Sequence, residues 1–508
     1  MPLLDRPAIA GAALAYFGLM LGIGWWAARR TRTSRDFFIA GQSIGLLVTG
    51  LATTSAAFSG FVFLGGPGLT YRLGVGSFFI VLSVGFTSAL LCWAVAKRLR
   101  LLAEVREVYT IPDAMAARYR SRGAAGLAAV AVLIGTVAYL GAQLRALGVL
   151  IEAIFGTRQY LGEGSLAVAV GVGVALVLGY AVAGGMVAGV YTDVLQGILM
   201  MAAAVAVFAY ALELGGAGEG LEGIAGAIAS SEAFGERFLD PLGTVPAATA
   251  FGFLFVFSIG VLGQPQMLHK FYMLRDPRQL RWLPLVIAVS QSLCVLIWLG
   301  LGLAVPALVA RGELPPLADP DHAAPAFLLG FVPEAVAALA FTAVLAAIMS
   351  TADSFVNLGS AALVRDLPRA LGRPLANELA WGRAAVVGIA LAAAGVAYAY
   401  ADLIALLGTF AFGTFGAALA PALAVGLNWR RVTAAAAIAS MATGMALSLG
   451  LELLGQGFLP ALDVLPEGVL PGAVALAGSF TVLFLVTWWT GRPEGDDLDD
   501  DVAAVMEA

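Results

Sequence analysis

The chain alternates between long apolar runs and short polar segments, and this pattern predicts membrane-spanning helices. An α-helix needs about 20 consecutive apolar residues to cross a bilayer. Candidate runs are 7–27, 44–66, 75–96, 124–154, 164–182, 187–212, 246–268, 283–310, 324–357, 379–400, 403–426, 432–454 and 468–490. The longest connection, 213–245, is rich in Gly and Glu, and we expect a small surface helix in it. The pattern therefore predicts an all-α, polytopic membrane protein with about thirteen transmembrane helices.

Composition supports this class. The chain is 60% hydrophobic and only 12% charged, whereas a soluble domain has about 25% charged residues. Cys92 and Cys294 lie in apolar runs and are too few for a disulfide scaffold or a metal cluster. His269 and His322 are expected in loops and form no ligand pair. We therefore expect no metal enzyme, no cofactor and no nucleic-acid partner.

The distribution of basic residues predicts the orientation. With these spans, 22 of the 28 Lys and Arg residues fall on one side of the membrane, which the positive-inside rule assigns to the cytoplasm. The run 7–27 is interpreted as a span, because an Arg-rich segment follows it where a signal peptide would have a cleavage site. Arg145, inside the fourth run, either extends outward or pairs with a carboxylate such as Glu152. We expect a multi-pass protein of the bacterial inner (plasma) membrane, with its N-terminus outside and its C-terminus in the cytoplasm.

The spans group into two halves of five. The segments are a leading helix and loop (1–36), a first repeat (37–212), an outer loop (213–245), a second repeat (246–426), two trailing helices (427–491) and an acidic tail (492–508). Five is odd, so the second half begins on the opposite side of the membrane, as an inverted repeat requires. The acidic tail is expected to be solvated and disordered.

Each half opens with a span that we expect to be broken. In the first, small and hydroxyl residues fill 51–60, and Gly and Pro follow at 65–68. The span that opens the second half, 246–268, contains Gly260, Gly263 and Pro265. Proline interrupts the helical hydrogen bonds, and the carbonyls it frees cannot face lipid. Either segment alone could be a kinked structural helix, but two of them opening matched halves favour broken helices around a site.

Oxygen-bearing residues in later spans are candidates for binding a hard cation such as sodium. Ser350 and Thr351 are adjacent hydroxyls, and Asp353 is a carboxylate two residues further on. Ionisable residues within a membrane are functional candidates. Asp193 and Asp353 are therefore candidates for a second ion site or an ion-exit path, although Asp193 could also be an ordinary solvated residue near the surface.

Six motifs resemble the sodium:solute symporter family, which includes the sodium/proline, sodium/pantothenate and sodium/glucose carriers. The likeness runs from about residue 37 to 426. The motifs are Phe37–Gly45, Phe58–Gly60 with Gly66–Gly68, Tyr109–Asp113, Gly184–Gly185 with Tyr191–Gln196, Gly263–Pro265 and Met349–Ser354. Each is weak alone, but together they occur in the order and at the topological places that the family has.

The resemblance implies a ten-helix inverted-repeat core, with one span before it and two after it. It also implies one sodium site between the first and eighth core helices. Carried over to this chain, its ligands are the backbone carbonyls of Ser55, Phe58 and Ala347 and the hydroxyls of Ser350 and Thr351.

The resemblance places the solute beside the two helix breaks. The implied solute residues are Ser59, Gly60, Tyr139, Phe257, Val261 and Gln264. The chain departs from the proline carriers at Ala57, where they have Asp, and at Phe257 and Val261, where they have Trp and Tyr. These departures put proline itself in doubt as the substrate.

The sequence thus predicts a sodium-coupled symporter that imports a small organic solute, such as a carboxylate or an amino acid, by alternating access. Sodium is then a co-substrate, and the other partners are the solute and the lipid bilayer. Proton-coupled or uncoupled transport on the same fold is the first alternative. A membrane-embedded solute sensor is another, but about seventeen residues after the last span leave no room for an output domain. A membrane enzyme is disfavoured because no catalytic motif is present.

Overall fold

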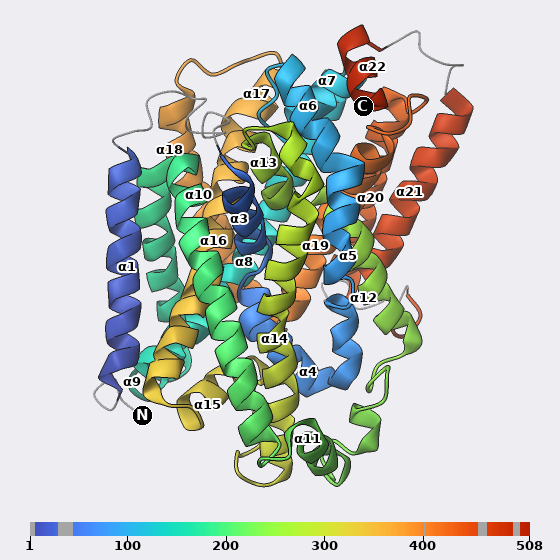
Figure 1. The fold of residues 1–508 in the computed structure, drawn as a ribbon. Coiled ribbons are helices and arrows are strands. Elements are labelled where there is room, and N and C mark those ends of the chain that lie inside the picture. The colour runs from blue at the N-terminus through green and yellow to red at the C-terminus, as the bar shows by residue number, and fades with distance from the viewer. Residues whose placement is uncertain (1–5, 29–43, 401, 456–464, 491–497) are drawn as a thin grey trace.

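Helices account for most of the chain in this computed structural model, which describes residues 6–28, 44–400, 402–455, 465–490 and 498–508. Long helices run side by side through the bundle (Figure 1). The long helices are α8 (Arg122–Phe155), α10 (Ser165–Gly215), α14 (Leu283–Ala310), α16 (Glu334–Ala361), α18 (Glu378–Ala399), α19 (Ile404–Ala420), α20 (Ala434–Gly455) and α21 (Pro471–Thr490). The predicted all-α architecture is confirmed.

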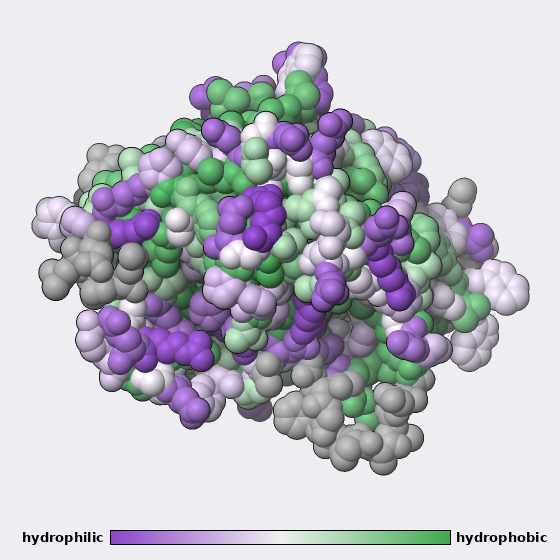
Figure 2. Space-filling model, turned by 90° about the horizontal axis from the view of Figure 1, so that it is seen from below, coloured by the Kyte–Doolittle hydropathy of each residue, from purple (hydrophilic) through white to green (hydrophobic). Residues whose placement is uncertain are grey.

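Shorter helices cap the two ends of the bundle. One end, called here the C-terminal face, carries α6 (Lys97–Val105), α7 (Ile111–Tyr119), α17 (Leu367–Ala370) and α22 (Asp500–Glu507). The opposite face carries α9 (Arg158–Leu161), α11 (Gly220–Ala229) and α15 (Ala323–Gly330). Viewed from that side, polar residues are spread among apolar ones across the surface (Figure 2). Such mixed surfaces are expected where helix ends and loops leave a membrane.

Ten helical segments in the described ranges are long and apolar enough to cross a membrane, or eleven with one bent pair. Two more segments match predicted spans, α1 (Pro7–Ala28) and the stretch from α5 (Val84–Leu91) through the π turn η5 (Cys92–Ala96) into α6. Counting these two together with the ten helices and the bent pair would give thirteen spans, and that number stays a prediction. The helical backbone runs without a break through α10, which contains most of the fifth and sixth predicted spans.

The first broken helix consists of α3 (Leu46–Ala57), the π turn η3 (Phe61–Gly65) and α4 (Gly66–Leu73). The axis of α3 is bent by 55° relative to the helical stretch that begins at Phe61. Phe58 ends α3 because its backbone is extended, with φ −97° and ψ 122°. Pro67 then lies in the first turn of α4, directly after the π turn, and Gly65 and Gly66 before it are already helical.

The second broken helix consists of α12 (Ala247–Ile259), the 3-10 turn η8 (Gly260–Gly263) and α13 (Pro265–Tyr272). Gln264 is extended, and Pro265 begins α13. Glycine is needed opposite this break, at Gly416 of α19, because a Cβ on Gly416 would lie 2.6 Å from the Cα of Gly260. Small residues allow this approach of helix backbones in membrane proteins.

The two broken helices lie inside the bundle. α3 packs against α10, α14 and α16, α4 packs against α14, and η8 packs against α19. The chain also joins the start of α3 to the end of α13, because the Ile44 amide donates to the Met273 carbonyl and Arg275 donates back to Ile44. Both breaks are therefore held within one framework of surrounding helices.

The prediction of a disordered acidic tail is wrong for its last part, which forms α22. Asp499 and Asp501 both pair with Arg106, and the Asp501 contacts are 2.7 Å. The Arg106 guanidinium holds the pKa of the Asp501 carboxyl below its usual range. Val502, Val505 and Met506 are buried against the bundle. The acidic residues therefore find a basic partner on the C-terminal face, and the apolar positions between them supply a helical face that packs.

His269 also departs from the prediction. It lies in α13 and is buried, rather than in a loop. His322 belongs to the 3-10 turn η10 (Pro320–His322), close to α15. No group of three or more His, Cys, Asp or Glu residues within the described ranges could hold a metal ion.

Candidate ion and solute site

The break in the first helix meets the hydroxyl pair of α16. Ser350 Oγ donates to the Ser55 carbonyl at 2.9 Å, which joins α16 to the end of α3. Ser350 Oγ is also 3.1 Å from the Ala347 carbonyl, and Thr351 Oγ1 donates to that same carbonyl at 3.0 Å. Ser55, Ser350 and Thr351 are each at most 1% exposed. Four of the five residues expected to bind sodium thus converge at one buried point.

Unwinding at the break redirects the amides that would otherwise close the helix. The Gly60 amide donates to Gln143 Oε1 of α8 at 3.0 Å. The Phe61 amide donates to Ser59 Oγ at 3.2 Å, and the Val62 amide donates to the Ser59 carbonyl at 2.9 Å. The carbonyls of Ala56, Ala57 and Phe58 therefore lose the donors that an unbroken helix would supply. Phe58, the fifth expected sodium ligand, belongs to this set.

A cavity lies beside the two breaks and is lined largely by apolar side chains. Ala57 and Phe58 come from the first break, and Phe257 and Val261 come from the second. Tyr139 of α8 also lines it, as do Thr87 and Gln291. None of the described residues lining this cavity is Asp, Glu, Lys, Arg or His. Any charge on a bound solute must therefore be balanced by backbone groups or by an ion.

Aromatic rings build one wall of the cavity. The Phe257 ring stacks on Phe61 with centroids 5.6 Å apart and on Phe412 with centroids 4.4 Å apart. The Tyr139 and Phe355 rings are also in contact, with centroids 4.6 Å apart. Such a wall fits an apolar solute body, because aromatic faces offer large apolar area in a fixed shape.

Three of the expected solute residues lie outside the lining. Ser59 and Gly60 are both bonded to Gln143, whose Nε2 is 3.4 Å from Ser59 Oγ. Gln264 is fully buried, and its Nε2 donates to the carbonyls of Gly260 at 3.0 Å and Phe412 at 2.9 Å. Gln264 thus ties the second break to α19, which is a structural contact.

The two carboxylates singled out as a second ion site are both buried, and one has an unexpected partner. Lys270 Nζ of α13 lies 2.7 Å from Asp193 Oδ2 of α10, and both side chains are 2% exposed. Asp353 of α16 accepts a hydrogen bond from Asn357 Nδ2 at 3.1 Å. Asp193 is therefore a buried ion-paired residue, and not the solvated surface residue that was the alternative.

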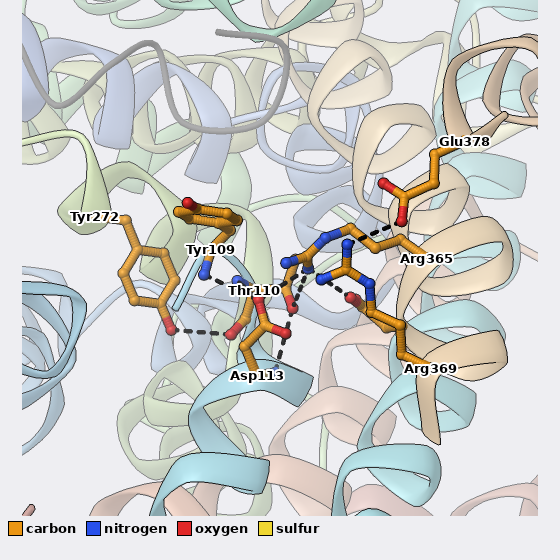
Figure 3. A network of polar contacts seen from close by, with 8 residues as sticks. Tyr109, Thr110, Asp113, Tyr272, Arg365, Arg369 and Glu378 are labelled. Atoms are coloured by element: carbon orange, nitrogen blue, oxygen red, sulfur yellow. Dashed lines mark hydrogen bonds and ion pairs between the residues drawn. The ribbon is translucent and has the colours of Figure 1, made fainter. Parts of the chain in front are cut away.

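A second polar network surrounds Thr110 and Asp113 at the start of α7 (Figure 3). Arg365 pairs with Asp113 at 2.8 Å and lies over the Tyr109 ring. Tyr272, at the end of α13, donates from its hydroxyl to the Thr110 carbonyl at 3.3 Å. The network thereby links α13 to the turn that begins α7.

Arg145, which was expected either to extend outward or to pair with Glu152, donates from Nη1 to the Tyr400 carbonyl near the end of α18. Several other residues of the site were missed by the sequence reasoning. Lys270 was counted only as a basic loop residue, and Gln143 and Phe412 were not considered. One signal was available for Lys270, because it lies five residues after Pro265 in a segment that is otherwise largely apolar.

Membrane-length helices, two of them broken, and a break that faces a hydroxyl pair define the class of inverted-repeat secondary transporters. A family model described as "Sodium:solute symporter family" matches residues 37–444. The chain belongs to the sodium:solute symporter family, and the resemblance noted in the sequence is confirmed.

Curated relatives match over most of their length. The chain is 30% identical over 454 residues to the high-affinity proline transporter PutP of Bacillus subtilis, covering 84% of this chain and 88% of that protein. It is 26% identical to the sodium/pantothenate symporter of Escherichia coli, covering 92% and 95%. It is 28% identical to the sodium/proline symporter of Escherichia coli, covering 87% of each.

Solved structures share the fold. A Na+-coupled sialic acid symporter in a substrate-bound outward-open state has a TM-score of 0.75 at 16% identity, covering 96% of this chain and 99% of that one. Mhp1, a nucleobase-cation-symport-1 family transporter in a closed conformation, has a TM-score of 0.55 at 14% identity, covering 94% and 99%. The fold of this chain is therefore that of known transporters.

Proposed function

We propose that this protein is a sodium-coupled symporter, and not an enzyme, and that it imports a small organic solute by alternating access. One observation carries the proposal: the 2.9 Å bond from Ser350 Oγ to the Ser55 carbonyl. This bond brings an unwound backbone and a hydroxyl pair together at a buried point between two core helices. Carbonyl and hydroxyl oxygens are the ligands that a hard cation prefers.

Coupling follows from thermodynamic linkage. Sodium held by Ser55, Phe58, Ala347, Ser350 and Thr351 would fix α3 against α16, and Phe58 also lines the cavity beside the break. Ion binding would then pre-form the solute pocket, and bound solute would tighten sodium by the same factor. The membrane potential adds about 2.3 kcal/mol per charge per 100 mV to the driving force.

The solute is proposed to lie in the cavity between Tyr139, Phe257 and Val261, close to the first break. Ser59 and Gly60 would act through their bonds to Gln143, which shape the break. Relatives named for proline and pantothenate support a small organic solute as the class. The C-terminal face is proposed to be cytoplasmic, in a bacterial plasma membrane, because the basic residues gather there.

The test is uptake into proteoliposomes that contain the purified protein. An inward sodium gradient should drive accumulation of one member of a panel of radiolabelled carboxylates and amino acids, and an equal potassium gradient should not. A pH gradient applied without sodium tests the proton-coupled alternative. Sodium-independent uptake that follows the pH gradient would contradict the proposal. Sodium-dependent stabilisation of the detergent-solubilised protein provides a second readout that needs no knowledge of the solute.

A further inference from the structure

A cavity of about 480 Å³ lies among the membrane-spanning helices α8, α18, α19 and α20, and it shares no lining residue with the proposed solute cavity. Ligand sites have volumes of about 300–1,000 Å³. An apolar cavity excludes water, so within a bilayer hydrocarbon is the material that fills it. Ten of the twelve described residues that line this cavity are apolar: Leu133, Ile134, Val137, Ala138, Val396, Ala399, Leu407, Phe410, Leu449 and Leu453.

The two polar residues of the lining meet at one end of the cavity. Tyr400 directly follows α18, and Glu452 lies in the last turn of α20. The Tyr400 hydroxyl donates to Glu452 Oε1 at 3.2 Å. Both helices begin near the C-terminal face, because α18 follows α17 and because Arg430, shortly before α20, pairs with Glu507 of α22. Tyr400 and Glu452 therefore lie toward the opposite face, where the lipid headgroups begin.

A basic group lies at the same end of the cavity. Arg145 Nη1 donates to the Tyr400 carbonyl. Arg145 follows Ala138 by two helical turns on α8, and residues at this spacing share one face of a helix. The face of α8 that lines the cavity thus continues to a guanidinium. This end consequently offers one negative and one positive group, which together complement a zwitterion.

The carboxylate of Glu452 can accept more than the bond from Tyr400. An ionised carboxylate has two oxygens with about four lone-pair sites. A carboxylate at membrane depth is costly and is expected to have a cationic partner. A primary ammonium suits this place, because it is a compact unit cation with three N–H donors. The apolar walls and the charged end together describe an amphiphile that carries an ammonium.

We propose that this cavity is a phospholipid site that prefers phosphatidylethanolamine. An acyl chain occupies the apolar part, the ammonium of the headgroup pairs with Glu452, and the phosphate faces Arg145. The site goes beyond the proposed function and does not depend on it. A lipid bound there braces two helices that also contribute to the solute cavity, through Tyr139 of α8 and Phe412 of α19.

The experiment measures lipid binding to the full chain in detergent by native mass spectrometry. Phosphatidylethanolamine, phosphatidylcholine and phosphatidylglycerol with identical acyl chains are titrated separately. Choline keeps the positive charge but has no N–H donor, and glycerol has no charge. We expect phosphatidylethanolamine to bind about tenfold more tightly than phosphatidylglycerol, with phosphatidylcholine between them, because hydrogen bonds between charged groups are worth about that factor.

Three variants locate the site. Glu452→Gln keeps the size of the side chain and its acceptor for Tyr400 but removes the charge, so the affinity for phosphatidylethanolamine should fall to that for phosphatidylglycerol. Ala399→Trp fills the cavity from an exposed lining position and should weaken the binding of all three lipids. Glu313→Gln removes a carboxylate that pairs with Arg311 and does not line the cavity, so it should behave as the wild type.

The order of the three lipids on the wild type tests the proposal even if a substitution prevents folding. Equal affinities for phosphatidylethanolamine and phosphatidylglycerol would overturn it, and tighter binding of phosphatidylglycerol would instead identify an anionic lipid. A preference for phosphatidylethanolamine that survives in Glu452→Gln, or unchanged binding by Ala399→Trp, would place the lipid elsewhere on the bundle. None of these outcomes involves transport, so sodium symport is decided separately by the uptake experiment.

Discussion

The two broken helices are made from similar sequence signals but end in different states. At the first break, the amides of Gly60 and Phe61 are taken by side chains, and carbonyls before them are left without helical donors. At the second, the Gln264 side chain donates to the carbonyls of Gly260 and Phe412. The first break keeps carbonyls without helical donors, and the second has carbonyls bonded by a side-chain amide. A Gly/Pro interruption thus creates free carbonyls, and the side chains opposite decide whether they remain free.

The second part of each broken helix rests on a turn that belongs to the other half. Tyr272 of α13 donates to the Thr110 carbonyl at the start of α7. Gly68 of α4 lies against η10, where a Cβ would be 2.6 Å from the Pro320 carbonyl oxygen. Each half therefore supports the second part of the other half's broken helix, at opposite faces of the bundle, as an inverted repeat predicts.

Removing the hydroxyl at the first break should have the largest effect. Ser350→Ala deletes a proposed ligand and the bond to Ser55, and interactions with charged groups are worth about 1.5–3 kcal/mol. The apparent sodium affinity should fall by about 10–100-fold. The measurement is the sodium dependence of uptake. Ser440→Ala, which removes a buried hydroxyl that donates to the Ser479 carbonyl, is the matched control and should leave sodium affinity unchanged. Equal affinities in all three proteins would refute the assignment.

Adding one methyl group to each break compares their packing directly. A Cβ at Gly60 would lie 2.6 Å from Ala146 Cβ and 2.9 Å from Ile348 Cγ1, whereas the nearest atom at Gly260 is 3.5 Å away. Gly60→Ala should therefore cost about 1–3 kcal/mol of stability through overpacking and abolish most uptake. Gly260→Ala should be tolerated. Thermal unfolding in detergent measures the difference, and equal melting temperatures would count against the close packing at the first break.

Opening the second break tests the role of the amide. Gln264→Ala removes the side-chain donor to the Gly260 and Phe412 carbonyls, at a cost of about 1–3 kcal/mol for the two bonds. Stability and maximal uptake should fall, while the apparent sodium affinity stays within about twofold, because the ion site lies at the other break. A loss of sodium affinity as large as that of Ser350→Ala would show that the two breaks act as one site.

The smallest effect is a pH dependence at the turn that supports α4. Burial raises the pKa of Asp321 from 3.8 to about 7, and the Ile404 amide, which donates to this carboxylate, only partly offsets it. In this pH range the folded protein binds the proton more tightly than the unfolded chain does. The contribution of Asp321 to stability should therefore decrease as pH rises from about 4 to 7 and stay constant above that.

Asp321→Asn removes this contribution. Relative to the wild type, the variant should gain melting temperature between pH 5 and pH 8. The relevant quantity is the difference in melting temperature between the two proteins, because Asp319 and His322 titrate in both. The hydrogen bond between these two residues favours their charged forms, so it lowers the pKa of Asp319 and raises that of His322. A difference that does not change with pH would contradict the assignment.

Much of the candidate site could be predicted from local sequence. The hydroxyls Ser350 and Thr351 and the small residues before Phe58 were found because intramembrane polar groups are rare and must serve a site. The family resemblance then brought them together. Gln264 is predicted to contact solute, and its amide is bonded to two carbonyls. Its partner Phe412 is 148 residues away, so no local pattern could indicate this pairing.

The sequence by itself determined the membrane-spanning helices and the positions of their breaks. Apolar length, glycine freedom and the missing N–H of proline act within a few residues, so they can be read locally. Only the tertiary structure decided that Lys270 is an internal cation and that α22 docks on Arg106. Those outcomes depend on which charges meet across helices, and Asp193 and Lys270 are 77 residues apart in the chain. Which charges come into contact depends on the register and rotation of each helix, and packing over the whole bundle sets that register and rotation.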